Sequence, residues 1–142
     1  MITAIDTNVL LDVLLPNDEF CDAAMAAIEQ SVTAGSLVIC DAVYAELCVH
    51  FSAQQDCDDF LAANQIRVEA LTRASQFAAS RVWREYRLQG GPRARILADF
   101  MVGAHAQFQA TRLLSRDRGF YRKLFPSLTL IDPSRSAGTD QE

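Results

Sequence analysis

Short apolar runs alternate along the chain with stretches whose apolar residues recur at helical spacing. The apolar runs predict buried strands at about residues 2–5, 37–40, 66–70, 112–115 and 128–131. The helical spacing predicts helices at about residues 8–15, 19–34, 41–51, 52–64, 72–88, 93–108 and 118–124. Strands separated by helices favour a parallel sheet that is covered on both faces. The expected fold class is therefore α/β, with three α/β/α layers around a central parallel sheet of four to five strands.

Polar residues at the element boundaries predict where the helices begin. The predicted N-terminal caps are Thr7 or Asn8, Asp18, Asp41, Ser52 in a capping-box pattern, and Thr72. Within the long helix that follows Thr72, Phe77 and Trp83 are expected to pack into the core. The helices that begin near Thr7 or Asn8 and at Asp41 are predicted to start directly after strands, so their first polar residues lie at the edge of the sheet.

The length of 142 residues fits one domain, which we expect to span residues 1–133. The remaining residues, 134–142, are small and polar, and we expect a disordered tail. The four cysteines lack the paired spacing of a structural zinc site and are expected to be reduced thiols. No apolar stretch approaches the roughly 20 residues that a membrane helix needs, so we expect a soluble, cytoplasmic protein.

Charge is distributed unevenly along the chain. Residues 1–66 contain eleven acids and no Lys or Arg, whereas residues 81–123 contain nine Arg and one Lys against three acids. An acidic region facing a basic region suits a protein that binds a metal with one and phosphate groups with the other. Solvated helix faces of unrelated composition explain the charge pattern equally well.

Four carboxylates interrupt otherwise apolar segments. Asp6 and Asp117 each follow a short strand, Asp99 lies in the first half of a nearly all-apolar helix, and Glu46 lies near the middle of the helix after the second strand. A single acid after a strand is more often a helix cap than a ligand. Four acids brought within about 4–6 Å would repel by roughly 3–4 kcal/mol per close pair at an effective dielectric constant near 20. Such a cluster requires protons or a cation.

Magnesium is the simplest cation for this set, because it prefers oxygen ligands and retains several waters. Metal-bound water can hydrolyse a phosphodiester. Thr7, Asn8 and Ser115 would support the ligands by fixing carboxylate rotamers or by orienting a metal-bound water, although each also suits an ordinary cap or turn.

These acids lie in segments that resemble the motifs of PIN-domain ribonucleases, and more closely those of the VapC toxins of bacterial toxin–antitoxin pairs. The similar segments are Ile5–Asn8, Tyr44–Leu47, Ile96–Ala106 and Leu114–Tyr121 with Phe125–Pro126. The resemblance implies a PIN-like fold and Mg²⁺- or Mn²⁺-dependent endonucleolytic cleavage of RNA, with Asp6, Glu46, Asp99 and Asp117 as catalytic metal ligands. It also implies inhibition by a cognate antitoxin protein and formation of a homodimer.

Arginines around the predicted acidic site are candidates for RNA-backbone contacts, since Arg binds phosphate in a bidentate manner. These candidates are Arg87, Arg93, Arg95, Arg116 and Arg118. Tyr121 and Phe120 lie near the site in the sequence, but Phe120 is expected to pack in the core. His105 lies most of two turns beyond Asp99 and is expected to be structural.

Two other functions fit parts of the sequence. A degenerate nuclease fold would bind RNA or a protein without catalysis, although retention of all four acids argues against it. A phosphatase of the haloacid-dehalogenase type also carries an Asp after its first strand, but it needs a second Asp two positions later, where Asn8 stands. The acids therefore favour a metal-dependent ribonuclease.

Overall fold

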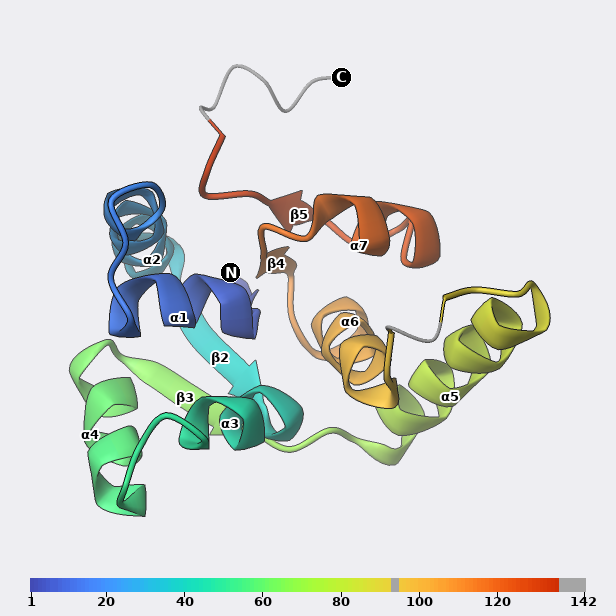
Figure 1. Ribbon diagram of the computed structural model, residues 1–142, viewed down its shortest axis with the longest axis horizontal. Coiled ribbons are helices and arrows are strands. Elements are labelled where there is room, and N and C mark those ends of the chain that lie inside the picture. Colours follow the sequence, from blue (N-terminus) through green and yellow to red (C-terminus); the bar gives the residue numbers. More distant parts are fainter. Residues whose placement is uncertain (93–94, 136–142) are drawn as a thin grey trace.

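The computed structural model describes residues 1–92 and 95–135 (Figure 1). The strands are β1 (Ile2–Ile5), β2 (Ser36–Cys40), β3 (Ile66–Glu69), β4 (Arg112–Leu114) and β5 (Leu130–Ile131). The helices are α1 (Thr7–Leu14), α2 (Cys21–Ala34), α3 (Asp41–Cys48), α4 (Gln54–Ala63), α5 (Arg73–Leu88), α6 (Leu97–Gln109) and α7 (Arg118–Leu124). One or two helices separate successive strands, as the sequence pattern predicts.

The strands form one five-stranded parallel sheet in the order β3-β2-β1-β4-β5. The chain adds β2 and β3 on one side of β1 and then crosses to add β4 and β5 on the other. In open α/β sheets, ligands bind at such a reversal, outside the carboxyl ends of the strands. The ends of β1 and β4 therefore define the expected location of a site.

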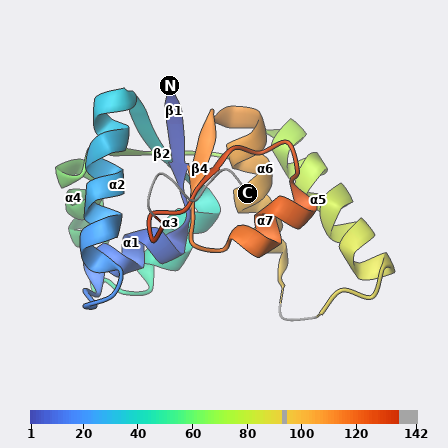
Figure 2. The ribbon, with the colours of Figure 1, turned by 90° about the horizontal axis from the view of Figure 1, so that it is seen from above.

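Helices cover both faces of this sheet. Figure 2 shows α1, α2 and α4 on one side and α5, α6 and α7 on the other, with α3 near the ends of the central strands. This arrangement confirms the predicted three-layer α/β/α fold. It also places loops from several elements beside the ends of β1 and β4.

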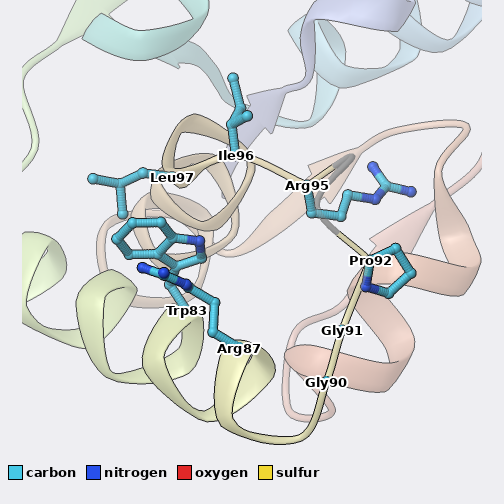
Figure 3. Close-up of a pocket in the computed structure, with 8 residues that line it drawn as sticks. All are labelled: Trp83, Arg87, Gly90, Gly91, Pro92, Arg95, Ile96 and Leu97. Atoms are coloured by element: carbon cyan, nitrogen blue, oxygen red, sulfur yellow. The ribbon is translucent and has the colours of Figure 1, made fainter.

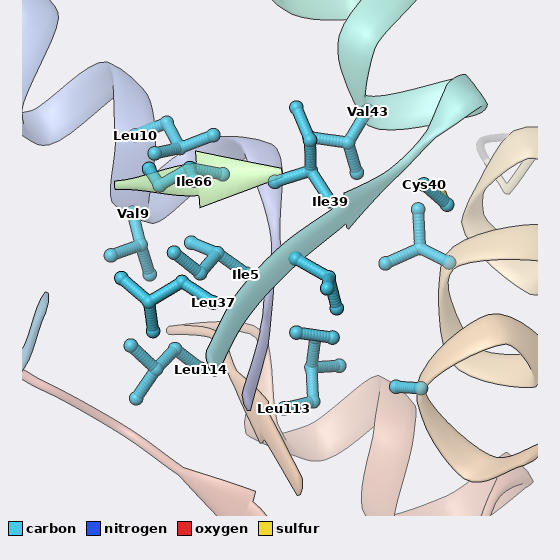
Figure 4. Packing of buried hydrophobic residues seen from close by; sticks show 14 of the residues in the cluster. Ile5, Val9, Leu10, Leu37, Ile39, Cys40, Val43, Ile66, Leu113 and Leu114 are labelled. Carbon is cyan, nitrogen blue, oxygen red and sulfur yellow. The ribbon is translucent and has the colours of Figure 1, made fainter. Parts of the chain in front are cut away.

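The core lies where β1, β2 and β4 pack against helices (Figure 4). Leu37, Val38 and Ile39 are all buried, because β2 is covered on both faces and therefore has a continuous apolar run. Each fully buried aliphatic side chain contributes about 1.5–3 kcal/mol relative to an exposed one. The centre of the sheet is therefore a rigid base for the residues that follow its strands.

Several predicted helix starts are wrong. Asp6 caps α1 in place of Thr7 or Asn8, because the helix begins directly after β1. The second helix begins at Cys21, after a turn in which Asn17 Oδ1, not Asp18, accepts a hydrogen bond from the Phe20 amide at 2.7 Å. Local spacing does not reveal which of several adjacent polar residues caps a helix.

Other boundaries differ for the same reason. Asp41 is the first residue of α3 and not its cap, and α4 begins at Gln54 without a capping bond from Ser52. The helix that contains Asp99 begins at Leu97. The cap by Thr72 is confirmed, since its Oγ1 accepts a hydrogen bond from the Ser75 amide at 3.1 Å.

The predicted core contains one error. Phe77 is 60% exposed, whereas Trp83 is half-buried and packs against the core.

Within the described residues, no helix is long and apolar enough to cross a membrane. All four cysteines are free, and two of them, Cys40 and Cys57, are buried.

Candidate active site

Asp6 lies at the carboxyl end of β1, next to the residues that follow β4. Ile5 pairs with Leu114 in the sheet, and the Asp6 amide donates to the Leu114 carbonyl at 2.9 Å. This register brings the Asp6 carboxylate to Ser115, whose hydroxyl donates to Asp6 Oδ2 at 2.8 Å. Two residues 109 positions apart in the sequence therefore meet through strand pairing.

Three further donors contact the Asp6 carboxylate. Oδ1 accepts from the Thr7 amide at 2.8 Å, and Oδ2 accepts from Tyr121 Oη at 2.9 Å and Asn8 Nδ2 at 3.4 Å. Burial raises the pKa of Asp6, and the charge of Asp117 adds to that rise, while hydrogen bonds from Ser115, Tyr121 and Thr7 oppose it. Asp6 is therefore both the cap of α1 and the most enclosed acid of the site.

Tyr121 contributes to this network from α7. Its side chain is only 2% exposed, so it cannot stack on an RNA base, and Phe120 is buried as expected. Burial, followed by the charge of Asp6, raises the pKa of Tyr121 well above its ordinary value, so its hydroxyl remains a donor. Sequence reasoning missed this contact; the available signal was the position of Tyr121 one helical turn after Asp117.

Asp117 follows β4 and has an arginine partner. Arg95, in the segment before α6, donates from Nη1 and Nη2 to the two carboxylate oxygens at 2.5 and 3.1 Å. The Asp117 amide donates to Ser115 Oγ at 3.0 Å, which joins Asp117 to the Asp6 network. The Ser115 hydroxyl thus connects the acids that follow β1 and β4.

Asp99 and Glu46 come from the helices. Asp99 Oδ2 accepts from the Ile96 amide at 3.0 Å, so this carboxylate holds the first turn of α6. Glu46 on α3 is more exposed than its apolar sequence surroundings suggested. Desolvation and then the charges of Asp6 and Asp99 raise the pKa of Glu46, while the Thr7 hydroxyl opposes that rise. Electrostatic coupling therefore links Glu46 to acids on two other elements.

The Thr7 hydroxyl is buried and has no hydrogen-bond partner among the described residues. Asn8 bridges two segments, because its Nδ2 is 3.4 Å from Ser115 Oγ and its Oδ1 accepts from the Arg116 amide at 3.2 Å. Within residues 1–92 and 95–135, no three His, Cys, Asp or Glu side chains are already arranged around one point that could hold a metal ion. The acids share a region, but the carboxylates of Asp6, Asp99 and Asp117 accept hydrogen bonds from protein donors.

The candidate RNA-binding arginines occupy different environments. Arg87 is exposed on α5, and Arg118 is buried, with Nη1 unpartnered among the described residues. Arg116 donates to the buried Asp12 from Nε and Nη2 at 2.7 and 3.1 Å. Arg93 lies outside the described residues. Of the described candidates, Arg87 and Arg95 are therefore the best placed to contact a ligand.

His105 is fully enclosed between α6 and the end of β3. Its Nε2 lies 2.9 Å from Glu69 Oε1, and Gln109 Nε2 donates to the same oxygen at 3.1 Å. This buried contact joins a helix to an edge strand and is consistent with the predicted structural role.

Comparisons with known proteins give a consistent match. A family model described as PIN domain matches residues 3–125. VapBC-1 from nontypeable Haemophilus influenzae shares the fold at a TM-score of 0.72 and 19% identity, over 95% of this chain and 100% of that one. VapBC2 from Rickettsia felis, solved with a DNA fragment from its promoter, has a TM-score of 0.69 and 18% sequence identity, and the match covers 92% of this chain and 98% of that one. A toxin–antitoxin complex from Klebsiella pneumoniae has a TM-score of 0.65 and 17% identity, with 92% of this chain and 97% of that one covered. No curated protein gives a significant match.

Proposed function

The chain belongs to the PIN domain family, whose model covers residues 3–125, and from this premise we propose that it is a divalent-metal-dependent endoribonuclease. The observation that carries the proposal is the electrostatic coupling of acids from separate elements, because the charge of Asp117 acts on Asp6 and the charges of Asp6 and Asp99 act on Glu46. Burial raises the pKa values of Asp6 and Glu46, and these neighbouring acids raise them further. A fold gains no stability from such repulsion, so a role in cation binding accounts for it best.

The donor set fits a hard divalent ion. All four proposed ligands, Asp6, Glu46, Asp99 and Asp117, supply carboxylate oxygens, which Mg²⁺ and Mn²⁺ prefer. The Thr7 hydroxyl lies near enough to Glu46 to lower its pKa but forms no hydrogen bond of normal geometry among the described residues, so it is a polar atom that a metal-bound water would satisfy. When bound, the ion would supply an acidified water and neutralise charge on the scissile phosphate.

The chain's own residues would prepare this site for RNA. Ser115 and Tyr121 donate to one oxygen of Asp6 and thereby fix the orientation of its carboxylate. Arg95 lies at Asp117, where its guanidinium can also contact a phosphate oxygen. The site thus combines ligands for a cation with a fixed positive charge for the RNA backbone.

The proposed biological role is that of a toxin controlled by an antitoxin protein. The similar structures named above include VapBC assemblies and a toxin–antitoxin complex, and they cover nearly the whole chain. The proposed partners are therefore an RNA substrate, a cognate antitoxin and a second copy of the chain in a homodimer.

A binding module without catalysis is the second candidate. The observation in its favour is that Arg95 pairs with Asp117 and that no three acids, within the described residues, are already arranged for an ion. This alternative predicts metal-independent binding of RNA or protein, whereas the nuclease predicts cleavage that requires Mg²⁺ or Mn²⁺.

The decisive experiment is a cleavage assay on single-stranded RNA with Mg²⁺, with Mn²⁺ and with EDTA. Asp6→Asn is expected to lower the cleavage rate at least about a hundredfold while the protein remains folded by circular dichroism. Asp41→Asn is the matched control, because Asp41 also follows a strand directly but is exposed at the start of α3. Equal cleavage by wild type and Asp6→Asn, or cleavage that persists in EDTA, would refute the proposal.

A further inference from the structure

A pocket of about 750 Å³ lies between the end of α5 and the start of α6 (Figure 3). It is lined by Trp83, Arg87, Gly90, Gly91, Pro92, Arg95, Ile96 and Leu97. Among the described residues this lining includes two arginines and no acid, although the whole chain has 18 acids and a net charge of −5. The lining is therefore basic in an acidic protein, with Arg87 outside any ion pair to the site acids and Arg95 bound to Asp117, and it favours an anionic ligand.

The rim of this pocket is held by contacts within the chain. The Tyr86 hydroxyl donates to the Pro92 carbonyl at 2.5 Å, and the Gly91 amide donates to the Tyr86 carbonyl at 2.9 Å. A side chain at Gly91 would collide with the Tyr86 ring, because an added Cβ would lie 2.5 Å from it. Glycine is therefore required for the loop to pack this closely against α5.

The pocket presents a flat, partly apolar surface. The Arg87 guanidinium carbon lies 4.9 Å from the centroid of the Trp83 ring. Figure 3 shows this guanidinium across the indole, with Leu97 beside the ring. Ile96, at the mouth, is 60% exposed. Planar heterocycles stack on indole rings and on guanidinium planes, so this surface suits an aromatic ligand that carries negative charge.

The pocket is continuous with the acidic site. Arg95 lines the pocket and also binds Asp117, while the amide of Ile96, another lining residue, donates to Asp99. A nucleotide in the pocket would therefore be adjacent to the proposed reaction centre. Tyr121 and Phe120 are both buried, and among the described residues that line the pocket Trp83 is the one aromatic side chain.

We propose that this pocket binds one base of the RNA strand next to the cleaved phosphodiester, with the base stacked on the Arg87–Trp83 pair. The inference rests on the proposed ribonuclease function and adds to it a determinant of substrate choice. Arg87 supplies the stacking plane, and Arg95 holds the adjoining phosphate. Only unpaired bases can enter, so the pocket selects single-stranded RNA.

The chain contains a built-in control for this arrangement. Arg81 lies 4.5 Å from the ring centroid of Phe77 on the same helix, and neither residue lines the pocket. The two arginine–aromatic pairs have similar geometry but different surroundings. Substitutions at Arg81 therefore measure the general effect of losing such a pair on α5.

Trp83 is the single tryptophan of the chain, so its fluorescence reports directly on the pocket. Wild-type protein in EDTA, which prevents metal-dependent cleavage, is titrated with a short single-stranded RNA, with the same RNA as a duplex, and with an abasic strand of equal charge. We expect only the single-stranded RNA with bases to quench Trp83. Equal quenching by the abasic strand would overturn the proposal in favour of simple charge attraction.

Substitutions then separate stacking from charge. Arg87→Lys keeps the positive charge but removes the planar guanidinium group on which the base would stack. It is expected to weaken the binding of single-stranded RNA about five- to a hundredfold and to leave the binding of the abasic strand unchanged. Arg81→Lys is expected to bind both strands like wild type. Equal effects of the two substitutions would overturn the proposal.

The cleavage assay distinguishes this inference from the proposed function. Metal-dependent RNA cleavage without any change in Trp83 fluorescence would overturn the base-binding pocket, leave the nuclease intact and favour a protein as the occupant. Quenching without cleavage in Mg²⁺ or Mn²⁺ would support the pocket and refute the nuclease.

Discussion

Arg116 and Asp117, which follow β4, each form an arginine–aspartate pair, and the two pairs differ in their exposure to solvent. Arg116 binds Asp12 on α1, and the side chains are 29% and 6% exposed. Arg95 binds Asp117 at the candidate site, and those side chains are 34% and 31% exposed. Each arginine also lies over an aromatic ring, Phe20 for Arg116 and Phe120 for Arg95.

The difference in exposure separates a structural pair from an exchangeable one. Asp12 has no access to water that could replace its arginine, so loss of Arg116 would leave a buried charge unpaired. Asp117 remains accessible, so another cation can compete with Arg95. The same bidentate contact therefore stabilises the fold at one location and adjusts the charge of the proposed metal site at the other.

The largest expected effect tests the buried pair. Arg116→Met should lower the free energy of unfolding by about 3 kcal/mol, because the buried Asp12 loses both hydrogen bonds from Arg116 and keeps, among the described residues, only the one from Asn17 Nδ2 at 3.4 Å. Urea denaturation measures this loss. Arg122→Met, an exposed substitution on α7, should change stability by less than about 0.5 kcal/mol.

A double variant isolates the cause. Asp12→Asn combined with Arg116→Met should recover part of the lost stability, since no buried charge remains.

Measuring RNA affinity tests the structural role of Arg116 against an RNA-binding role, because the sequence also makes Arg116 a candidate for RNA contact. A tenfold loss of RNA affinity in Arg116→Met with full stability would show that Arg116 binds RNA and is not structural.

An intermediate effect tests the exchangeable pair. Arg95→Met removes a positive charge from Asp117 and should increase the affinity for Mn²⁺ about tenfold, by roughly 1.4 kcal/mol. Isothermal titration calorimetry without RNA measures this change. Arg87→Met is the control, because Arg87 contacts Trp83 and is not part of an ion pair with the site acids. Unchanged or weaker Mn²⁺ binding by Arg95→Met would mean that Arg95 does not compete with the metal.

The smallest expected effect concerns Glu46, whose pKa is raised mainly by desolvation and then by Asp6 and Asp99. A carboxyl with a higher pKa in the folded state than in the unfolded state binds more protons when folded, so its contribution to stability falls as pH rises through that pKa. Glu46→Gln should therefore stabilise the metal-free protein at pH 8, by less than about 1 kcal/mol, and have no such effect near pH 4.

Urea denaturation in EDTA at both pH values tests this sign. Glu29→Gln, on an exposed part of α2, controls for general loss of negative charge. A Glu46→Gln variant that is less stable than wild type at pH 8, or equally stabilised at both pH values, would contradict the prediction.

Much of the fold was predictable because its signals are local. The continuous apolar run of Leu37–Cys40 predicts a strand buried on both faces, and β2 contains these residues. The positions of Asp6 and Asp117 after strands also follow from the sequence, since parallel strands bring their carboxyl ends to one edge. Helix caps were less predictable, because Asp6, Thr7 and Asn8 are adjacent and all suit that role.

The sequence by itself determined the order of strands and helices, the segregation of acidic and basic residues, and the four acids proposed as ligands. Only the tertiary structure decided which partner each charged side chain has. Arg116 is next to Asp117 in the chain but binds Asp12, 104 residues away, whereas Asp117 binds Arg95. A side chain bonds to whatever lies within a few ångströms after folding, and the crossover from β3 to β4 sets those neighbours. The sequence therefore indicated a reactive edge, and the packing of distant segments determined how its charges are shared.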